Sequence, residues 1–104
     1  MRTRSLPSAE LALLRAVFRR HPEIREVRLF GSRAKGAQTF HSDIDLALWG
    51  EVDELQAAAI AAELDELPLP YRYDVTPFAS IALPSLREHI ERVGLPLYPV
   101  AALP

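Results

Sequence analysis

The chain has 104 residues, a length that predicts one domain over residues 1–104 with a single hydrophobic core. Hydrophobic residues make up 49% of the sequence, charged residues make up 25%, and no apolar run approaches the roughly 20 residues of a membrane span, so we expect a globular cytoplasmic protein. The absence of cysteine excludes disulfides and thiolate metal sites, and the net charge of −2 argues against direct nucleic-acid binding.

The first predicted element is a helix that begins near Pro7 and stops at His21-Pro22. Its apolar residues recur at helical spacing: Leu11, Leu14, Val17 and Phe18. Residues 26–30 then alternate polar and apolar side chains, which indicates a half-buried strand, and Gly31-Ser32 ends that strand with a turn.

A second strand is predicted from Asp43 to Trp49. Strand residues alternate between two faces, so Ile44, Leu46 and Leu48 would face one side of the sheet. The other side would carry Asp43, Asp45 and Ala47.

An amphipathic helix is predicted from Glu51 to Leu67. Its expected apolar stripe consists of Val52, Leu55, Ala59 and Ala62, with Ile60 and Leu64 beside it.

A third strand is predicted over residues 71–78, a short helix over residues 84–93 and an extended segment over residues 95–100. Within the third strand, Arg72, Asp74 and Thr76 would share one face. The sum is an α+β fold: a small mixed sheet with helices packed on one face, which leaves the other face free for polar chemistry.

Two aspartates on that free face predict a metal site. Asp43 and Asp45 would project the same way, about 7 Å apart at a rise of roughly 3.3 Å per residue. Carboxylates that converge on one point repel each other unless a cation joins them, and their hard oxygen ligands suit Mg²⁺ or Mn²⁺. Asp74 on the neighbouring strand is the best candidate for a third ligand.

The Gly-Ser turn predicts a phosphate site. Gly31 lets the backbone approach a ligand closely, and amides at the start of a following helix point at anions. Ser32, Arg33 and Lys35 would add donors to phosphate oxygens. Ser42 is a further candidate for nucleotide contact, although its position before the strand favours a structural role.

Together these features suit phosphoryl-type transfer, in which positioning and charge neutralisation supply nearly all of the catalysis. Asp74 would act there as general base or would orient the acceptor.

Gly31-Ser32, ten intervening residues and Asp43-Ile44-Asp45 resemble the signature of the minimal nucleotidyltransferase (MNT) branch of the polymerase-beta-type nucleotidyltransferase superfamily. Further stretches add to the resemblance: Arg33-Ala34-Lys35-Gly36, Tyr73-Asp74-Val75 and residues 86–94 with Leu97-Tyr98. The sequence departs from the pattern after the third strand, where many members have hydrophobic and acidic residues and this chain has Thr76-Pro77-Phe78.

The resemblance implies a polymerase-beta-like fold and a metal-dependent transfer of AMP from ATP to a hydroxyl. It also implies a partner, a helical HEPN-type protein encoded nearby, whose tyrosine would be the acceptor in a type VII-like toxin–antitoxin pair. Two alternatives stay open: a non-catalytic antitoxin that neutralises the HEPN protein by forming a complex, and a transferase that acts on a small molecule.

Overall fold

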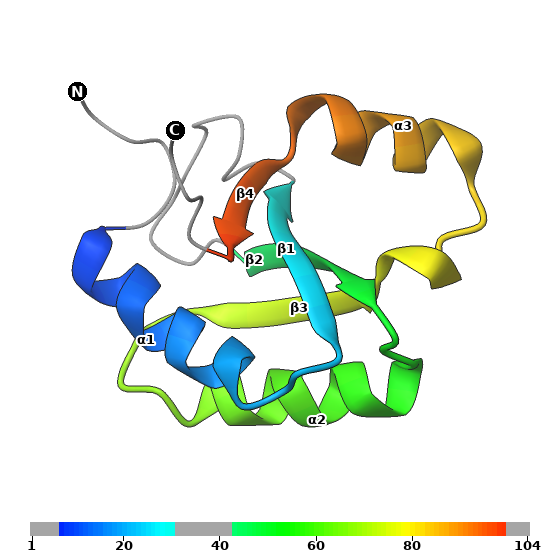
Figure 1. The fold of residues 1–104 in the computed structure, drawn as a ribbon. Coiled ribbons are helices and arrows are strands. Elements are labelled where there is room, and N and C mark those ends of the chain that lie inside the picture. Colours follow the sequence, from blue (N-terminus) through cyan, green and yellow to red (C-terminus); the bar gives the residue numbers. More distant parts are fainter. Residues whose placement is uncertain (1–6, 31–42, 100–104) are drawn as a thin grey trace.

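The computed structural model describes residues 7–30 and 43–99, and residues 1–6, 31–42 and 100–104 lie outside the description. The elements in chain order are α1 (Ser8–Arg19), β1 (Ile24–Phe30), β2 (Asp43–Gly50), α2 (Glu54–Asp65), β3 (Arg72–Pro77), the 3-10 turn η1 (Phe78–Ser80), α3 (Pro84–Val93) and β4 (Leu95–Tyr98) (Figure 1). Each predicted helix and strand in this range is present, with end points shifted by a few residues. None of the described helices has the length and apolar character that crossing a membrane requires.

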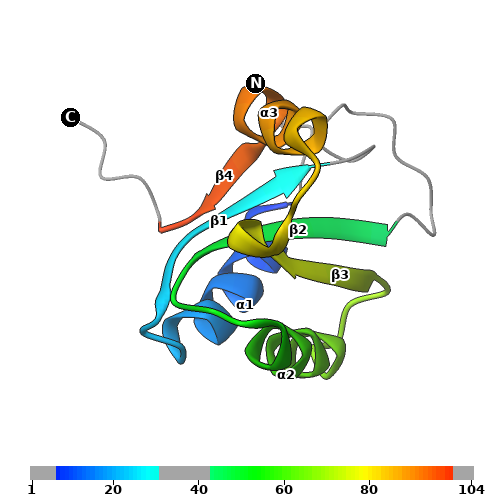
Figure 2. The ribbon, with the colours of Figure 1, turned by 90° about the vertical axis from the view of Figure 1, so that its right-hand side faces the viewer.

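The four strands form one mixed sheet in the order β3-β2-β1-β4. β1 is antiparallel to both of its neighbours, whereas β2 and β3 are parallel and are joined through α2. Figure 2 shows α1 and α2 on one side of this sheet and α3 on the other. The predicted α+β class with a small mixed sheet is confirmed.

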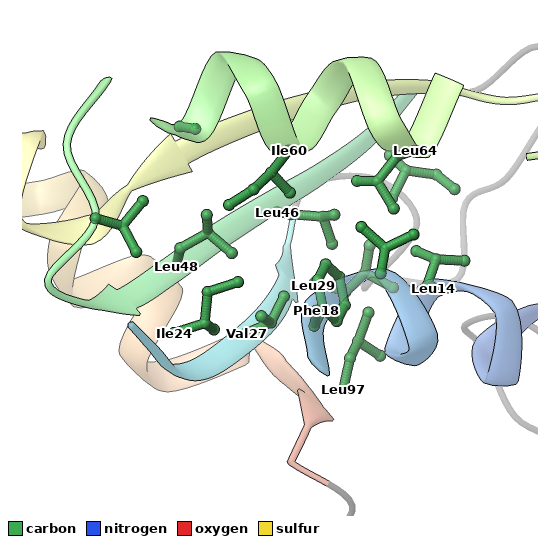
Figure 3. Packing of buried hydrophobic residues seen from close by; sticks show 14 residues of the cluster. Leu14, Phe18, Ile24, Val27, Leu29, Leu46, Leu48, Ile60, Leu64 and Leu97 are labelled. Carbon is green, nitrogen blue, oxygen red and sulfur yellow. The ribbon is translucent and has the colours of Figure 1, made fainter. Parts of the chain in front are cut away.

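The main core lies between the sheet and the pair α1 and α2 (Figure 3). The predicted inward face of the second strand is confirmed, since Ile44, Leu46 and Leu48 are at most 1% exposed. The helices contribute six buried residues to the same cluster: Leu14, Val17, Phe18, Ala57, Ile60 and Leu64. Burial of this apolar surface is the main force that holds the sheet against the two helices.

The opposite face of the sheet is partly covered, although the sequence predicted that helices would leave it free. A second cluster of buried residues there consists of Ala47, Phe78, Ile81 and Ile90. α3 and η1 bring three of these residues onto the sheet after the chain leaves β3. The cover reaches Ala47, which is 0% exposed, and so polar chemistry on this face is confined to the end of β2 that carries Asp45.

The helix α2 spans Glu54–Asp65 and corrects part of a second expectation: it buries Ile60 and Leu64, which were predicted beside the apolar stripe, but not the stripe residues that lie within the helix. Asp53 caps its start: the Asp53 carboxylate accepts a hydrogen bond of 2.8 Å from the Gln56 backbone N–H. The buried residues are Ala57, Ile60 and Leu64, whereas Leu55 is 82% exposed. Ala59 and Ala62, which were also expected in the buried stripe, are exposed as well.

Tyr73 on β3 carries a buried hydroxyl that has no hydrogen-bond partner within the described part of the chain. Burial, and secondly the neighbouring Tyr71, raise the pKa of Tyr73 to about 12. Because an unpaired buried hydroxyl costs free energy, Tyr73→Phe is expected to raise the free energy of unfolding at pH 7 by about 1 kcal/mol, as measured by urea denaturation.

The pH dependence of the same variant gives a second test. A tyrosine with an ordinary pKa near 10 in the unfolded chain ionises there before the folded Tyr73 does, so the wild-type protein loses stability between about pH 10 and pH 12. The free energy of unfolding of Tyr73→Phe should fall less than that of the wild-type protein over the same pH range. Tyr71→Phe is the matched control, because the Tyr71 hydroxyl donates a 2.6 Å hydrogen bond to Glu10 and its removal should be destabilising. Equal losses of stability in both variants at pH 7 would contradict the prediction.

Candidate active site

The register of the sheet places two of the predicted aspartates side by side. Asp45 of β2 is the Cα partner of Asp74 on the parallel strand β3, and Phe30 of β1 is the partner of Asp45 on its other side. Paired residues on neighbouring strands lie about 4.8 Å apart and project to the same face. Phe30, Asp45 and Asp74 therefore form one row across three strands, on the face opposite the main core.

The two carboxylates of this row are accessible to different degrees. Asp45 is half-buried on the central strand β2, and Asp74 is exposed on β3, which lies at the edge of the sheet. A row that runs from a shielded carboxylate to an open one has a protected end and an end at which a second molecule can approach.

Asp43, which was predicted to bind the metal together with Asp45, is the first residue of β2, and its Cα partner on β3 is Arg72. The Asp43 side chain lies outside the described part. The predicted phosphate-binding residues Gly31, Ser32, Arg33, Lys35 and Ser42 also lie outside the described residues. β1, which precedes residues 31–42 in the sequence, ends at Phe30, beside Asp45.

The described carboxylates fit a divalent cation as a partial site. No group of three His, Cys, Asp or Glu residues that could hold a metal ion occurs in residues 7–30 and 43–99, apart from the undescribed Asp43 side chain. Asp45 and Asp74 supply two hard oxygen donors from adjacent strands. Mg²⁺ in proteins is commonly held by one or two carboxylates and takes its remaining ligands from water and substrate phosphates, so this donor set is compatible with it.

A stack of side chains bounds the row on the side of α3. The rings of Trp49 and Phe78 are stacked with centroids 4.3 Å apart. The Arg28 guanidinium lies 4.9 Å from the centre of the Trp49 ring, and the Arg87 guanidinium lies 4.3 Å from the centre of the Phe78 ring. Cations over aromatic faces are held by the ring quadrupole, so these four residues join the sheet to η1 and α3.

Hydrogen bonds from the two arginines complete this wall. Arg87 donates to the carbonyl oxygens of Phe78 at 3.1 Å and Ile81 at 2.9 Å. Arg28 donates to the Glu26 carboxylate at 2.6 Å and to the Glu91 carbonyl oxygen at 3.3 Å. This wall was not predicted from the sequence, in which its only signal is that β1 and β2 each place a large side chain on the polar face.

Comparisons with known proteins agree with this arrangement. The family model described as "Polymerase beta, Nucleotidyltransferase" matches residues 13–100. A protein of Haemophilus influenzae named "Probable protein adenylyltransferase MntA" is 32% identical over 90 residues, which cover 85% of this chain and 78% of that protein.

Two solved structures show the same fold. A toxin–antitoxin crystal structure with AMP-PNP matches with a TM-score of 0.71 at 25% identity and covers 89% of this chain and 73% of that chain. A structure of a tri-AMPylated Shewanella oneidensis HEPN toxin in complex with MNT antitoxin matches with a TM-score of 0.66 at 22% identity and covers 86% of this chain and 70% of that chain.

Proposed function

Because the chain belongs to the polymerase beta nucleotidyltransferase family, we propose that it is a metal-dependent enzyme that transfers AMP from ATP to a tyrosine hydroxyl of a HEPN toxin, and that it acts as the antitoxin of that partner. The observation that carries the proposal is the row of Asp45 and Asp74 beside the end of β1. ATP is a cytoplasmic metabolite, so we place the reaction in the cytoplasm.

The relatives support the choice of nucleotide and acceptor. The Haemophilus influenzae relative is named as a protein adenylyltransferase, and the structure at 25% identity holds an analogue of ATP. The Shewanella oneidensis structure contains an AMPylated HEPN toxin, and at 22% identity its likeness supports the fold. We further propose that residues 1–104 act as one catalytic domain, with the acceptor supplied by the partner protein.

The proposed site residues divide between the nucleotide and the metal. Gly31 and Ser32, with Arg33, Lys35 and Ser42 around them, would bind the phosphates of ATP, because backbone amides and basic side chains donate to phosphate oxygens. Asp43, Asp45 and Asp74 would hold Mg²⁺ or Mn²⁺. When bound there, the cation would supply neutralisation of the phosphate charge and polarisation of the acceptor hydroxyl.

The transfer itself is a single displacement at the α-phosphorus of ATP. A bond forms between the acceptor oxygen and the α-phosphorus, the bond from that phosphorus to the bridging oxygen of the β-phosphate breaks, and pyrophosphate leaves with its electron pair. The acceptor proton would pass to Asp74, whose exposed position on the edge strand lets an incoming hydroxyl reach it. Asp45, on the protected side, would remain a ligand of the cation that neutralises the phosphates.

The first test is the intact mass of the neighbouring helical HEPN protein after incubation with this protein, ATP and Mg²⁺. We expect the HEPN protein to gain the mass of one or more AMP groups, and we expect no gain when the metal is removed with EDTA. Peptide mapping would then place the modification on a tyrosine.

A stable complex that binds ATP but leaves the mass of the HEPN protein unchanged would contradict the proposed transfer. That outcome would favour the non-catalytic antitoxin, which neutralises its partner by covering it. Labelling of a small hydroxyl compound in place of the protein would favour the third function that the sequence leaves open.

A further inference from the structure

The acceptor must reach the Asp45–Asp74 row from a side that the protein leaves open. Toward the carboxyl end of β2, the next residue on the same face is Ala47, which is 0% exposed under the cluster of Phe78, Ile81 and Ile90. On the β1 side, β1 is itself paired with β4. Among the described residues, the edge strand β3 is the side of the row at which no further strand is paired.

Arg72 lies on this open side. It is two residues before Asp74 on β3, so strand alternation places both side chains on the same face, about 7 Å apart along the strand. Arg72 is exposed, and it makes no hydrogen bond or ion pair with the rest of the described chain. Its Cα partner on β2 is Asp43, whose side chain lies outside the described part, so Arg72 is a cation without a partner among the described residues, next to the proposed base.

Arg72 lies on the strand that is farther from the end of β1 than the central strand β2 is. The residues proposed to bind phosphate follow β1 in the sequence, and β1 and β3 lie on opposite sides of β2 in the sheet. A guanidinium on the outer strand thus faces the molecule that enters over Asp74. A guanidinium forms two parallel hydrogen bonds with a carboxylate or a phosphate, and of these two groups the carboxylate is the one that an unmodified protein acceptor carries in its side chains.

We propose that Arg72 is a specificity-determining residue that binds an acidic side chain of the acceptor protein close to the hydroxyl that receives AMP. This inference rests on the proposed function and adds the recognition chemistry of the acceptor. The ion pair would hold the hydroxyl residue over Asp74, so Arg72 would affect binding of the acceptor without affecting binding of ATP.

The test measures AMP transfer to the HEPN protein with Arg72→Gln, while the concentrations of acceptor and ATP are varied in turn. We expect the KM for the acceptor to rise about tenfold or more and the KM for ATP to stay within twofold, because one charge-assisted hydrogen-bonded pair is lost. Arg72→Lys should restore part of the loss, since it keeps the charge but cannot form the paired hydrogen bonds.

Arg19→Gln is the matched control, because Arg19 is also exposed but lies at the end of α1, on the far side of the sheet. The Arg19→Gln variant should leave the KM for the acceptor and the KM for ATP unchanged. Higher ionic strength should raise the acceptor KM of the wild-type protein more than that of Arg72→Gln, because salt screens an exposed ion pair. A parallel rise in the KM for ATP would assign Arg72 to the triphosphate and overturn the inference.

A measurement without nucleotide separates this inference from the proposed transfer. The dissociation constant of the complex with the HEPN protein, measured by calorimetry in the absence of ATP, should rise for Arg72→Gln and stay constant for Arg19→Gln. An unchanged constant for Arg72→Gln would overturn the inference, whether or not the wild-type protein transfers AMP. A raised constant in a protein that transfers no AMP would leave Arg72 as a docking residue and would remove the proposed reaction alone.

Discussion

Asp45→Asn is expected to lower the rate of AMP transfer roughly a thousandfold, which corresponds to about 4 kcal/mol of transition-state stabilisation. Asp45 lies in the centre of the carboxylate row, between Phe30 and Asp74. The amide keeps the shape of the side chain and removes its charge, so the proposed site loses the more protected of its two described carboxylates. Removal of a single well-placed charged or hydrogen-bonding group commonly costs a factor of about 100 to 1,000 or more in rate.

The measurement is single-turnover AMP transfer from labelled ATP to the HEPN protein, combined with thermal unfolding of each variant. Asp45→Asn should unfold within a few degrees of the wild-type protein, because Asp45 is half-buried on a polar face and not part of the core. Asp65→Asn is the matched control: Asp65 is exposed at the end of α2, and this variant should keep full activity. Transfer by Asp45→Asn at the wild-type rate would reject the assigned site.

The carboxylate row shows how far local sequence pattern reaches. The alternation of residues 43–49 was sufficient to predict the face that β2 turns to the main core, because a strand has a fixed period of two. It did not predict that Ala47 on the other face is also buried, since η1 and α3 cover that residue. The same period predicted that Asp74 would share a face with Arg72. The pairing of Asp45 with Asp74 needed the parallel register of β2 and β3, which depends on the α2 crossover and is not encoded in either strand alone.

The helix α2 shows where a periodic pattern fails. Its sequence is apolar on nearly every side, so several stripes match helical spacing about equally well. The protein buries Ala57, Ile60 and Leu64. It leaves Leu55, the third large branched residue of the helix, 82% exposed. Alanines lie on several sides of this helix, and burying one alanine rather than another changes the buried apolar area little. Tertiary packing against the sheet therefore decides which face is buried.

The wall beside the site could not be predicted from the sequence for a different reason. Its four residues come from two strands, the turn η1 and a helix: Arg28, Trp49, Phe78 and Arg87. None of them alone indicates in the sequence that it belongs to a stack. Their stack arises only when α3 folds onto the face opposite α1. The restriction of the polar face to the Asp45 end is thus a property of the assembled fold.

Phe18→Ala is expected to lower the free energy of unfolding by about 3 to 5 kcal/mol, a large share of the roughly 5 to 15 kcal/mol that stabilises an ordinary domain. Phe18 is 0% exposed in the main core, and its ring lies 5.6 Å from that of Tyr98, centroid to centroid, so it joins α1 to β4. Truncation removes this apolar surface and leaves a cavity that the surrounding side chains fill only in part. Urea denaturation measures the loss.

Leu13→Ala is the matched control on the same helix, because Leu13 is 37% exposed and its truncation removes less buried surface than truncation of Phe18. Leu13→Ala should lower the free energy of unfolding by less than about 1 kcal/mol.

Phe18 lies on the opposite side of the sheet from Asp45, so the AMP transfer rate per folded molecule of Phe18→Ala should equal that of the wild-type protein at low temperature. Asp45→Asn should show the reverse, with stability kept and activity lost. Equal losses of stability in Phe18→Ala and Leu13→Ala would show that the packing of α1 on the sheet does not hold the core together, and a loss of transfer rate per folded molecule in Phe18→Ala would show that the site depends on that packing.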